Sequence, residues 1–129
     1  MPLLFSLVES TLHPRLGHLY QQLGITEESF GSARKLHKAL QQQKPDFFVG
    51  DFIYGYANNY AGTNLSNLDV TLATIQSVAP ETKVIVFVQP NEEVHARRLA
   101  ELFPIHAILK YPVVEQEMRA ALLCEAKHA

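Results

Sequence analysis

The sequence predicts a single α/β domain built on a five-stranded parallel sheet. Three short apolar runs, at residues 3–8, 47–53 and 84–88, have the length and composition of strands buried on both faces. Segments with apolar residues at helical spacing lie between the predicted strands. Such an alternation of strands and helices predicts a parallel sheet with helices on both of its faces.

Composition narrows the class of protein. The chain has 129 residues, which predicts one domain spanning residues 1–129. Its net charge of −2 argues against direct nucleic-acid binding, which usually requires a basic patch. No stretch approaches the ~20 apolar residues of a membrane helix, and the N-terminus lacks the basic start of a signal peptide. We therefore expect a cytoplasmic protein without membrane insertion.

The first third of the chain predicts two β–α units. After the first strand, Ser10 is a possible N-cap of a helix that ends at Gly24. Residues 25–30 form a weaker strand, and a second helix begins at its N-cap Ser32 and ends before Pro45. The apolar face of the first helix is formed by Leu12, Leu16, Leu19 and Leu23.

Three further units follow. A long loop separates the strand at 47–53 from a third helix that ends at Pro80, and Asn91 is expected to cap a fourth helix. Residues 105–109 form a short fifth strand. The last helix has apolar residues at Val114, Met118, Ala121 and Leu122. Five such units, joined by right-handed crossovers, predict the doubly wound, flavodoxin-like sheet order 2-1-3-4-5.

Two stretches resemble the receiver domains of response regulators. A second helix is followed by Pro45-Asp46, four mostly apolar residues and Asp51, which is the spacing of the receiver phosphoacceptor. Residues 79–87 resemble the approach to the fourth receiver strand. The resemblance implies a role in two-component signalling and assigns Asp51 to the phosphoacceptor position.

The resemblance also implies a set of partners for Asp51 that this chain lacks. Receivers stabilise the aspartyl phosphate with Mg²⁺, a Lys and a Ser/Thr hydroxyl. The acidic pair that helps to hold Mg²⁺ falls near Leu7 and Val8, which are apolar, although the adjacent Glu9 can supply one carboxylate. We therefore expect no Mg²⁺ site at Asp51.

The two remaining receiver positions are also changed. Val88 stands at the hydroxyl position, and Tyr111 stands at the Lys position, with Lys110 one residue early. A shift of one residue turns a side chain to the other face of a strand. The resemblance further implies a cis peptide before Pro112. The candidate strand-end cleft comprises Glu9, Asp51, Val88, Gln89, Lys110, Tyr111 and Pro112.

Two surfaces are candidates for binding. The loop of residues 54–67 is long and carries Tyr54, Tyr56 and Tyr60, residues that suit a binding surface; the alternative is a tolerated insertion. The fourth helix, fifth strand and fifth helix correspond to the usual interaction face of receivers, where we expect a protein partner or a homodimer; the alternative is a solvated edge. That face comprises Val94, Arg97, Arg98, Glu101, Phe103, His106 and Met118.

Metal and enzyme chemistry have little support in the sequence. None of the six histidines forms an i,i+4 pair with another, and the one cysteine, Cys124, reads as a packed apolar residue. Neither a nucleophile–base pair nor a Gly-rich phosphate loop is present. The sequence therefore predicts a protein that is not an enzyme and that holds neither a metal nor a cofactor.

The favoured interpretation is a degenerate receiver-like module, or pseudo-receiver, that acts through protein–protein interaction without Mg²⁺-dependent phosphorylation. Two alternatives remain open. One is a functional phosphoacceptor receiver that uses Asp51 with relocated ligands. The other is a small-ligand-binding domain that uses the strand-end cleft and the tyrosine-rich loop.

Overall fold

The predicted five-stranded parallel sheet is present in the computed structural model, which describes residues 2–54 and 66–123. The strand order is β2-β1-β3-β4-β5, which confirms the order 2-1-3-4-5. The elements are β1 (Leu3–Leu7), α1 (Gly17–Gln22), β2 (Thr26–Phe30), α2 (Ala33–Leu40), β3 (Phe47–Asp51), α3 (Asp69–Val78), β4 (Lys83–Val88), the 3-10 helix η1 (Pro90–Glu92), α4 (Glu93–Leu102), β5 (Ala107–Lys110) and α5 (Glu115–Leu123).

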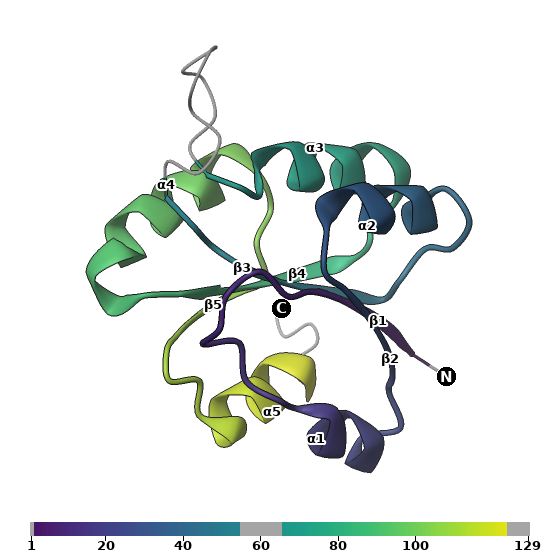
Figure 1. The fold of residues 1–129 in the computed structure, drawn as a ribbon, viewed down its shortest axis with the longest axis horizontal. Helices are drawn as coiled ribbons and strands as arrows, with labels where there is room; N and C mark the ends of the chain where they lie inside the picture. The colour runs from purple at the N-terminus through teal and green to yellow at the C-terminus, as the bar shows by residue number, and fades with distance from the viewer. Residues whose placement is uncertain (1, 55–65, 124–129) are drawn as a thin grey trace.

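Helices cover both faces of the sheet. Helices α1 and α5 lie on one face, and α2, α3 and α4 lie on the other (Figure 1). Successive residues of a strand point to opposite faces, so the central strands supply two separate cores. On β3, Phe48 belongs to the core beneath α2, α3 and α4, whereas Val49 belongs to the core beneath α1 and α5.

The edge strand β2 is the most polar strand of the sheet. It pairs in parallel with β1 along one side only, and Glu27 and Glu28 are exposed. The hydroxyl of Ser6 on β1 donates a hydrogen bond of 2.8 Å to Oε2 of Glu27. The weak strand expected at residues 25–30 is therefore confirmed, and its carboxylates are those of a solvated sheet edge.

The first helix begins later than the leucine spacing indicates. It starts at Gly17, and Leu12 lies in the preceding loop with 48% of its surface exposed. The expected start near Ser10 is wrong because the backbone N–H groups of Glu9 and Ser10 donate to a side chain on β3. Those residues therefore form a loop that turns across the end of the sheet.

Two helix caps were predicted, and one is found. The hydroxyl of Ser32 accepts a hydrogen bond from the backbone N–H of Lys35 at 3.3 Å, which confirms it as the N-cap of α2. Asn91 instead lies within η1, and α4 begins at Glu93 without a side-chain cap. Within residues 2–54 and 66–123, no helix has the length and apolar character needed to cross a membrane.

Candidate functional site

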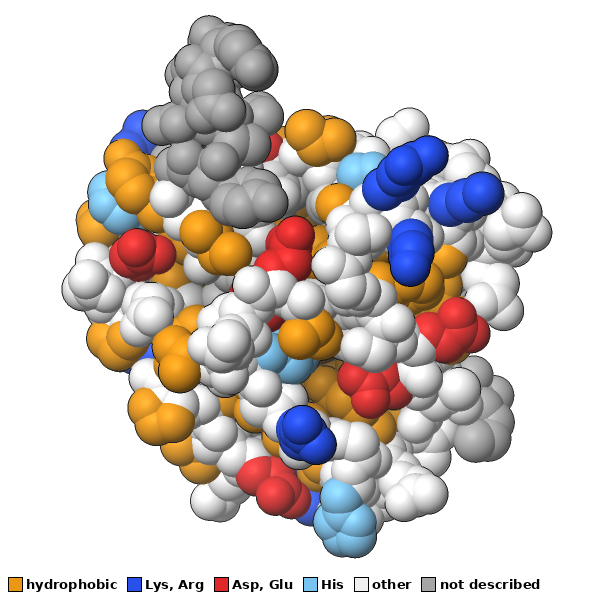
Figure 2. Space-filling model, in the orientation of Figure 1, with side chains coloured by type: hydrophobic (Ala, Val, Ile, Leu, Met, Phe, Trp, Pro, Cys, Tyr) orange, Lys and Arg blue, Asp and Glu red, His pale blue; other side chains and the backbone are white. Residues whose placement is uncertain are grey.

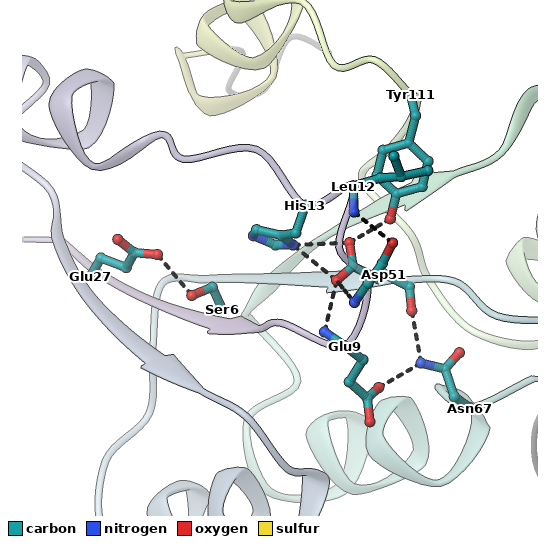
Figure 3. A network of polar contacts seen from close by, with 9 residues as sticks. Ser6, Glu9, Leu12, His13, Glu27, Asp51, Asn67 and Tyr111 are labelled. Atoms are coloured by element: carbon teal, nitrogen blue, oxygen red, sulfur yellow. Dashed lines mark hydrogen bonds and ion pairs between the residues drawn. The ribbon is translucent and has the colours of Figure 1, made fainter.

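Asp51 lies at the end of β3 and is fully buried beneath a ring of hydrogen-bond donors. The backbone N–H groups of Glu9 and Ser10 donate to Oδ2, at 2.9 and 3.1 Å. Nδ1 of His13 lies 2.9 Å from Oδ1 and 3.0 Å from Oδ2, and the hydroxyl of Tyr111 donates to Oδ1. Figure 3 shows these groups converging on the one carboxylate. Both oxygens are thus occupied by groups of the chain itself.

The sheet order explains how these distant residues meet. The carboxyl ends of all five parallel strands lie at the same end of the sheet, where β1 and β3 are neighbours. The loop that follows β1 carries His13, and Tyr111 follows β5 directly. The ring of Phe87 on β4 lies near both, with centroids 5.3 Å from His13 and 6.2 Å from Tyr111. The ring of Phe87 therefore packs near both side chains that hydrogen-bond to Asp51.

The electrostatics favour an ionised Asp51. Burial alone would raise the pKa of this carboxyl, but the hydrogen bonds from His13 and Tyr111, the charge of a protonated His13 and the N–H of Glu9 together hold the pKa below its ordinary value. Burial and the adjacent carboxylate raise the pKa of Tyr111, so that its hydroxyl keeps its proton. Because a carboxylate only accepts hydrogen bonds, the proton of the His13–Asp51 contact lies on Nδ1.

Asn67 binds the second carboxylate of the site. Its Nδ2 donates to Oε1 of Glu9 at 2.6 Å and to the backbone oxygen of Asp51 at 2.8 Å, and its Oδ1 accepts from the N–H of Ile53 at 2.7 Å. Burial raises the pKa of Glu9, the hydrogen bond from Asn67 lowers it, and the charge of Asp51 raises it, with a net increase. Glu9 is therefore bound to Asn67 and less acidic than an ordinary glutamate.

The Mg²⁺ ion that the receiver resemblance implies does not fit these residues. Mg²⁺ requires several free oxygen ligands in octahedral geometry. Leu7 is buried and apolar, the Glu9 side chain is turned to Asn67, and Asp51 has no oxygen without a donor. In the described part of the chain, no group of three or more His, Cys, Asp or Glu side chains is placed to hold a metal ion.

The remaining cleft residues are only partly brought together. Glu9, Gln89 and Tyr111 line a pocket of about 200 Å³ beside the Asp51 network. Val88 is fully buried in the core, so it does not line the cleft. The side chain of Lys110 is directed to α4, where its Nζ lies 3.4 Å from Oε1 of Glu93. The peptide between Tyr111 and the exposed Pro112 is cis, as predicted.

Only the two ends of the tyrosine-rich loop, Tyr54 at its start and Ser66 and Asn67 at its end, lie in the described structure. The ring of Tyr54 stacks on that of His95 of α4, with centroids 3.7 Å apart and an interplanar angle of 14°. The binding candidates Tyr56 and Tyr60 lie outside the described residues, as does Cys124. Tyr54 therefore joins the end of β3 to the surface of α4.

The predicted interaction face is partly exposed. Val94 is 62% exposed, Arg98 and Glu101 are exposed, and Nη2 of Arg97 lies 2.6 Å from Oε2 of Glu93. Met118 was assigned to this face wrongly, because it points into the core beneath α1 and α5 and is fully buried. The partly buried Phe103 packs against the other core, and Nε2 of His106 donates to the backbone oxygen of Ala121 at 2.9 Å.

Hydrophobic side chains gather on the left of the view in Figure 2, over the side of the molecule where Figure 1 places α4 and β5. Val94 and Leu102 are large apolar residues of α4 that are exposed, at 62% and 61%. At the upper right of Figure 2, Lys and Arg side chains gather over α2, whose exposed cations are Arg34, Lys35 and Lys38. The apolar and the basic surfaces are thus separated on the molecule.

His13 and Asn67 are the site residues that sequence reasoning missed. They lie 38 and 16 residues from Asp51 and belong to no recognisable motif with it. A signal was available in the predicted sheet order, because β1 and β3 are adjacent and a polar residue soon after β1 falls next to the end of β3. The leucine spacing obscured that signal by predicting a helix there.

Comparison with known proteins identifies the fold. No protein-family model and no curated protein sequence matches the chain. Solved structures do: a response regulator receiver domain protein from Clostridium thermocellum is 19% identical, with a TM-score of 0.71 over 94% of this chain and 90% of that chain. A putative response regulator from Chloroflexus aurantiacus J-10-fl is 11% identical, with a TM-score of 0.73 over 95% of both chains.

The receiver domain of the TMAO respiratory system response regulator TorR is also similar, at 15% identity and a TM-score of 0.70 over 95% of this chain and 93% of that chain. At identities this low, the likeness concerns the fold and carries no residue roles. The five-stranded parallel sheet and its strand order agree with it. The chain has the flavodoxin-like fold of the receiver domains of response regulators.

Proposed function

We propose that this domain is a receiver-fold signalling module that acts in the cytoplasm through protein–protein contact, without Mg²⁺-dependent phosphorylation of Asp51. One observation carries the proposal. The carboxylate at the phosphoacceptor position is fully buried, and both its oxygens accept hydrogen bonds from the chain.

Phosphoryl transfer to Asp51 would require a carboxylate oxygen that is free to attack. Here an incoming phosphoryl group would have to displace Tyr111 from Oδ1, or the backbone N–H groups of Glu9 and Ser10 from Oδ2, and His13 contacts both oxygens. The product would also bury additional negative charge in a site where Lys110 is turned to Glu93. The geometry therefore disfavours the reaction at both its start and its end.

A receiver that is not phosphorylated can still present a surface. The exposed Val94 and Leu102 of α4 offer apolar contacts, and Arg97, Arg98 and Glu101 surround them with charge. Apolar residues enclosed by a polar rim are typical of protein interfaces. We therefore place the partner-binding surface on α4 and β5, and a second copy of the chain is one candidate for the partner.

The test uses the reagents that activate ordinary receivers. The protein is melted with and without Mg²⁺ and beryllofluoride, and incubated with acetyl phosphate before intact-mass measurement. We expect an unchanged melting temperature and no phosphorylated species, because a ligand raises stability only if it binds the native state. A phosphorylation-competent receiver treated in parallel verifies the reagents.

A stabilisation by beryllofluoride that disappears in Asp51→Asn would support the functional-receiver alternative instead. The variant Tyr111→Phe makes the test sharper, since it frees Oδ1 of one donor while leaving the ring in place. If Tyr111→Phe alone becomes phosphorylated, the hydroxyl of Tyr111 is the group that blocks the reaction.

A further inference from the structure

A second pocket lies beside the Asp51 network, between the loop that follows β1 and the end of β2. It has a volume of about 390 Å³, within the range of small-ligand sites. Its lining is chemically mixed and includes a buried imidazole, a cation, a carboxylate and apolar side chains. The residues that supply these groups are His13, Arg15, Glu27, Val8 and Leu16.

His13 presents an unused polar atom to this pocket. Its side chain is only 6% exposed, and Nδ1 is fixed by the carboxylate of Asp51. Nε2 forms no hydrogen bond with any residue that the structure describes. In Figure 3 the ring directs one nitrogen to Asp51 and the other to the side where Glu27 and Ser6 lie. The contact with Asp51 therefore holds Nε2 in a fixed direction, where it is available for a hydrogen bond with a ligand.

Arg15 and Glu27 place opposite charges on the same pocket. Both side chains are exposed, and among the described residues neither forms an ion pair. Oε2 of Glu27 accepts the hydroxyl of Ser6, which orients the carboxylate and leaves Oε1 for another donor. The pocket lining therefore contains one positive and one negative side chain, which are the complements of a ligand that carries both charges.

We propose that this pocket binds a free α-amino acid with a small apolar side chain. The ammonium group donates to the carboxylate of Glu27, and the ligand carboxylate pairs with Arg15. Nε2 of His13 forms a further hydrogen bond with the ligand, and the side chain lies against Val8 and Leu16. The site is separate from the α4 surface, so the proposal stands or falls independently of the proposed function.

Heteronuclear NMR titration of the full chain tests the proposal with L-alanine, L-valine and L-leucine as probes. We expect saturable shifts with at least one probe at millimolar concentration, a range that corresponds to about −4 kcal/mol of binding free energy. The shifts should centre on residues 8–17 and 27–29. N-acetyl-L-valine lacks the ammonium group and L-valinamide lacks the carboxylate, so neither should bind.

Two variants test whether Arg15 and Glu27 bind the charged groups of the ligand. Arg15→Gln and Glu27→Gln should each weaken binding about tenfold or more, as expected when one partner of a charge-assisted contact is removed. Glu27→Gln keeps an oxygen for Ser6, and thermal melting verifies that both variants fold. Arg119→Gln changes a cation of α5 that does not line the pocket and should bind like the wild type.

Three outcomes would overturn the proposal. The first is the absence of saturable shifts with all three probes. The second is equal binding of the N-acetyl or amide analogue, or unchanged binding by folded Arg15→Gln. The third is a set of shifts centred on the pocket of about 410 Å³ that Lys44, Pro45 and Thr82 line at the opposite edge of the sheet, which would place the ligand elsewhere.

Discussion

The hydroxyl of Tyr111 donates a hydrogen bond to Oδ1 of Asp51, a residue 60 positions earlier in the chain. The contact joins the residue that follows β5 to the end of β3, with Phe87 of β4 packed near both. A tyrosine at this position supplies a neutral donor where the receiver resemblance implies a lysine. The network therefore ties Asp51 to the chain itself, while the adjacent Lys110 pairs with Glu93 of α4.

Removal of this donor should destabilise the domain. We expect Tyr111→Phe to lower the free energy of unfolding by about 1–3 kcal/mol, the usual contribution of a hydrogen bond to a charged group. Urea denaturation measures the change. Tyr54→Phe is the matched control, because Tyr54 is 45% exposed and its ring contact with His95 does not need the hydroxyl. Equal losses in both variants would contradict a specific role for the Tyr111 hydroxyl.

Asp51 should make the stability of the domain depend on acid pH. Its pKa in the folded state lies below the ordinary value of 3.8, so the unfolded chain takes up the proton first. The stabilisation is therefore complete above that ordinary value and is lost as the pH falls through the lower folded pKa. Asp51→Asn should be less stable near neutral pH, and its stability should fall less steeply in acid. Parallel acid titrations of the urea midpoint in the two proteins would reveal this difference.

Ionisation of Glu9 should lower the stability of the domain, the opposite of the effect of Asp51. Its folded pKa is raised above 4.5, so ionisation costs stability as the pH rises through and beyond that value. Glu9→Gln keeps an oxygen for Asn67 and should stabilise the protein at neutral pH by about 0.5 kcal/mol, a small value because the side chain is only half-buried. Glu101→Gln, at an exposed position, should have no such effect. A loss of stability in Glu9→Gln would show that the carboxylate charge is needed.

A charge in the central sheet should abolish folding. Val86 is fully buried on β4 between β3 and β5, and Val86→Asp would place a carboxylate there without a partner. We expect an insoluble protein or one without a cooperative melting transition. Val70→Asp introduces the same charge at a position that is 55% exposed and should fold normally. Cooperative melting of Val86→Asp would contradict the central position of β4.

If the partner binds at α4, variants of the α4 surface should weaken association, whereas a variant of Asp51 should not. Val94→Asp and the double reversal Arg97→Glu/Arg98→Glu should weaken self-association or the affinity for a purified partner, because both alter the exposed surface of α4. Asp51→Asn should leave both properties near wild type wherever the variant is folded. Sedimentation velocity and titration calorimetry provide the comparison. If only Asp51→Asn alters association, the switch lies at the strand ends.

The sheet could be predicted from the sequence because its strands are local features. Residues 3–8, 47–53 and 84–88 are short apolar runs of strand length, a pattern typical of the central strands of a parallel sheet. The start of α1 could not be predicted in this way. Leu12 continues the leucine spacing, yet the N–H groups of Glu9 and Ser10 donate to Asp51, which lies 42 and 41 residues away from them.

The candidate site was predicted in its positions and missed in its connections. The sequence places Asp51, Glu9 and Tyr111 at the site, but it predicts that the Asp51 carboxylate lacks partners. In the structure that carboxylate is bound by His13, by Tyr111 and by the backbone after β1. Hydrogen bonds between distant side chains leave no periodic pattern in a sequence. The assignment of Met118 failed for a related reason, since the side of α5 that faces the sheet depends on how that helix packs.

The carboxylates of β2 have a consequence for the behaviour of the protein at high concentration. A parallel sheet ends in a row of unpaired backbone groups, and such a row invites the strand of another molecule to add to it. Glu27 and Glu28 stand exposed along that border, so two copies that approach through β2 would bring like charges together. The opposite border, β5, has partly buried apolar residues and only Lys110 as a charge. Aggregation in a destabilised form of this protein should therefore begin at β5, and a lysine introduced in the middle of β5 should suppress it.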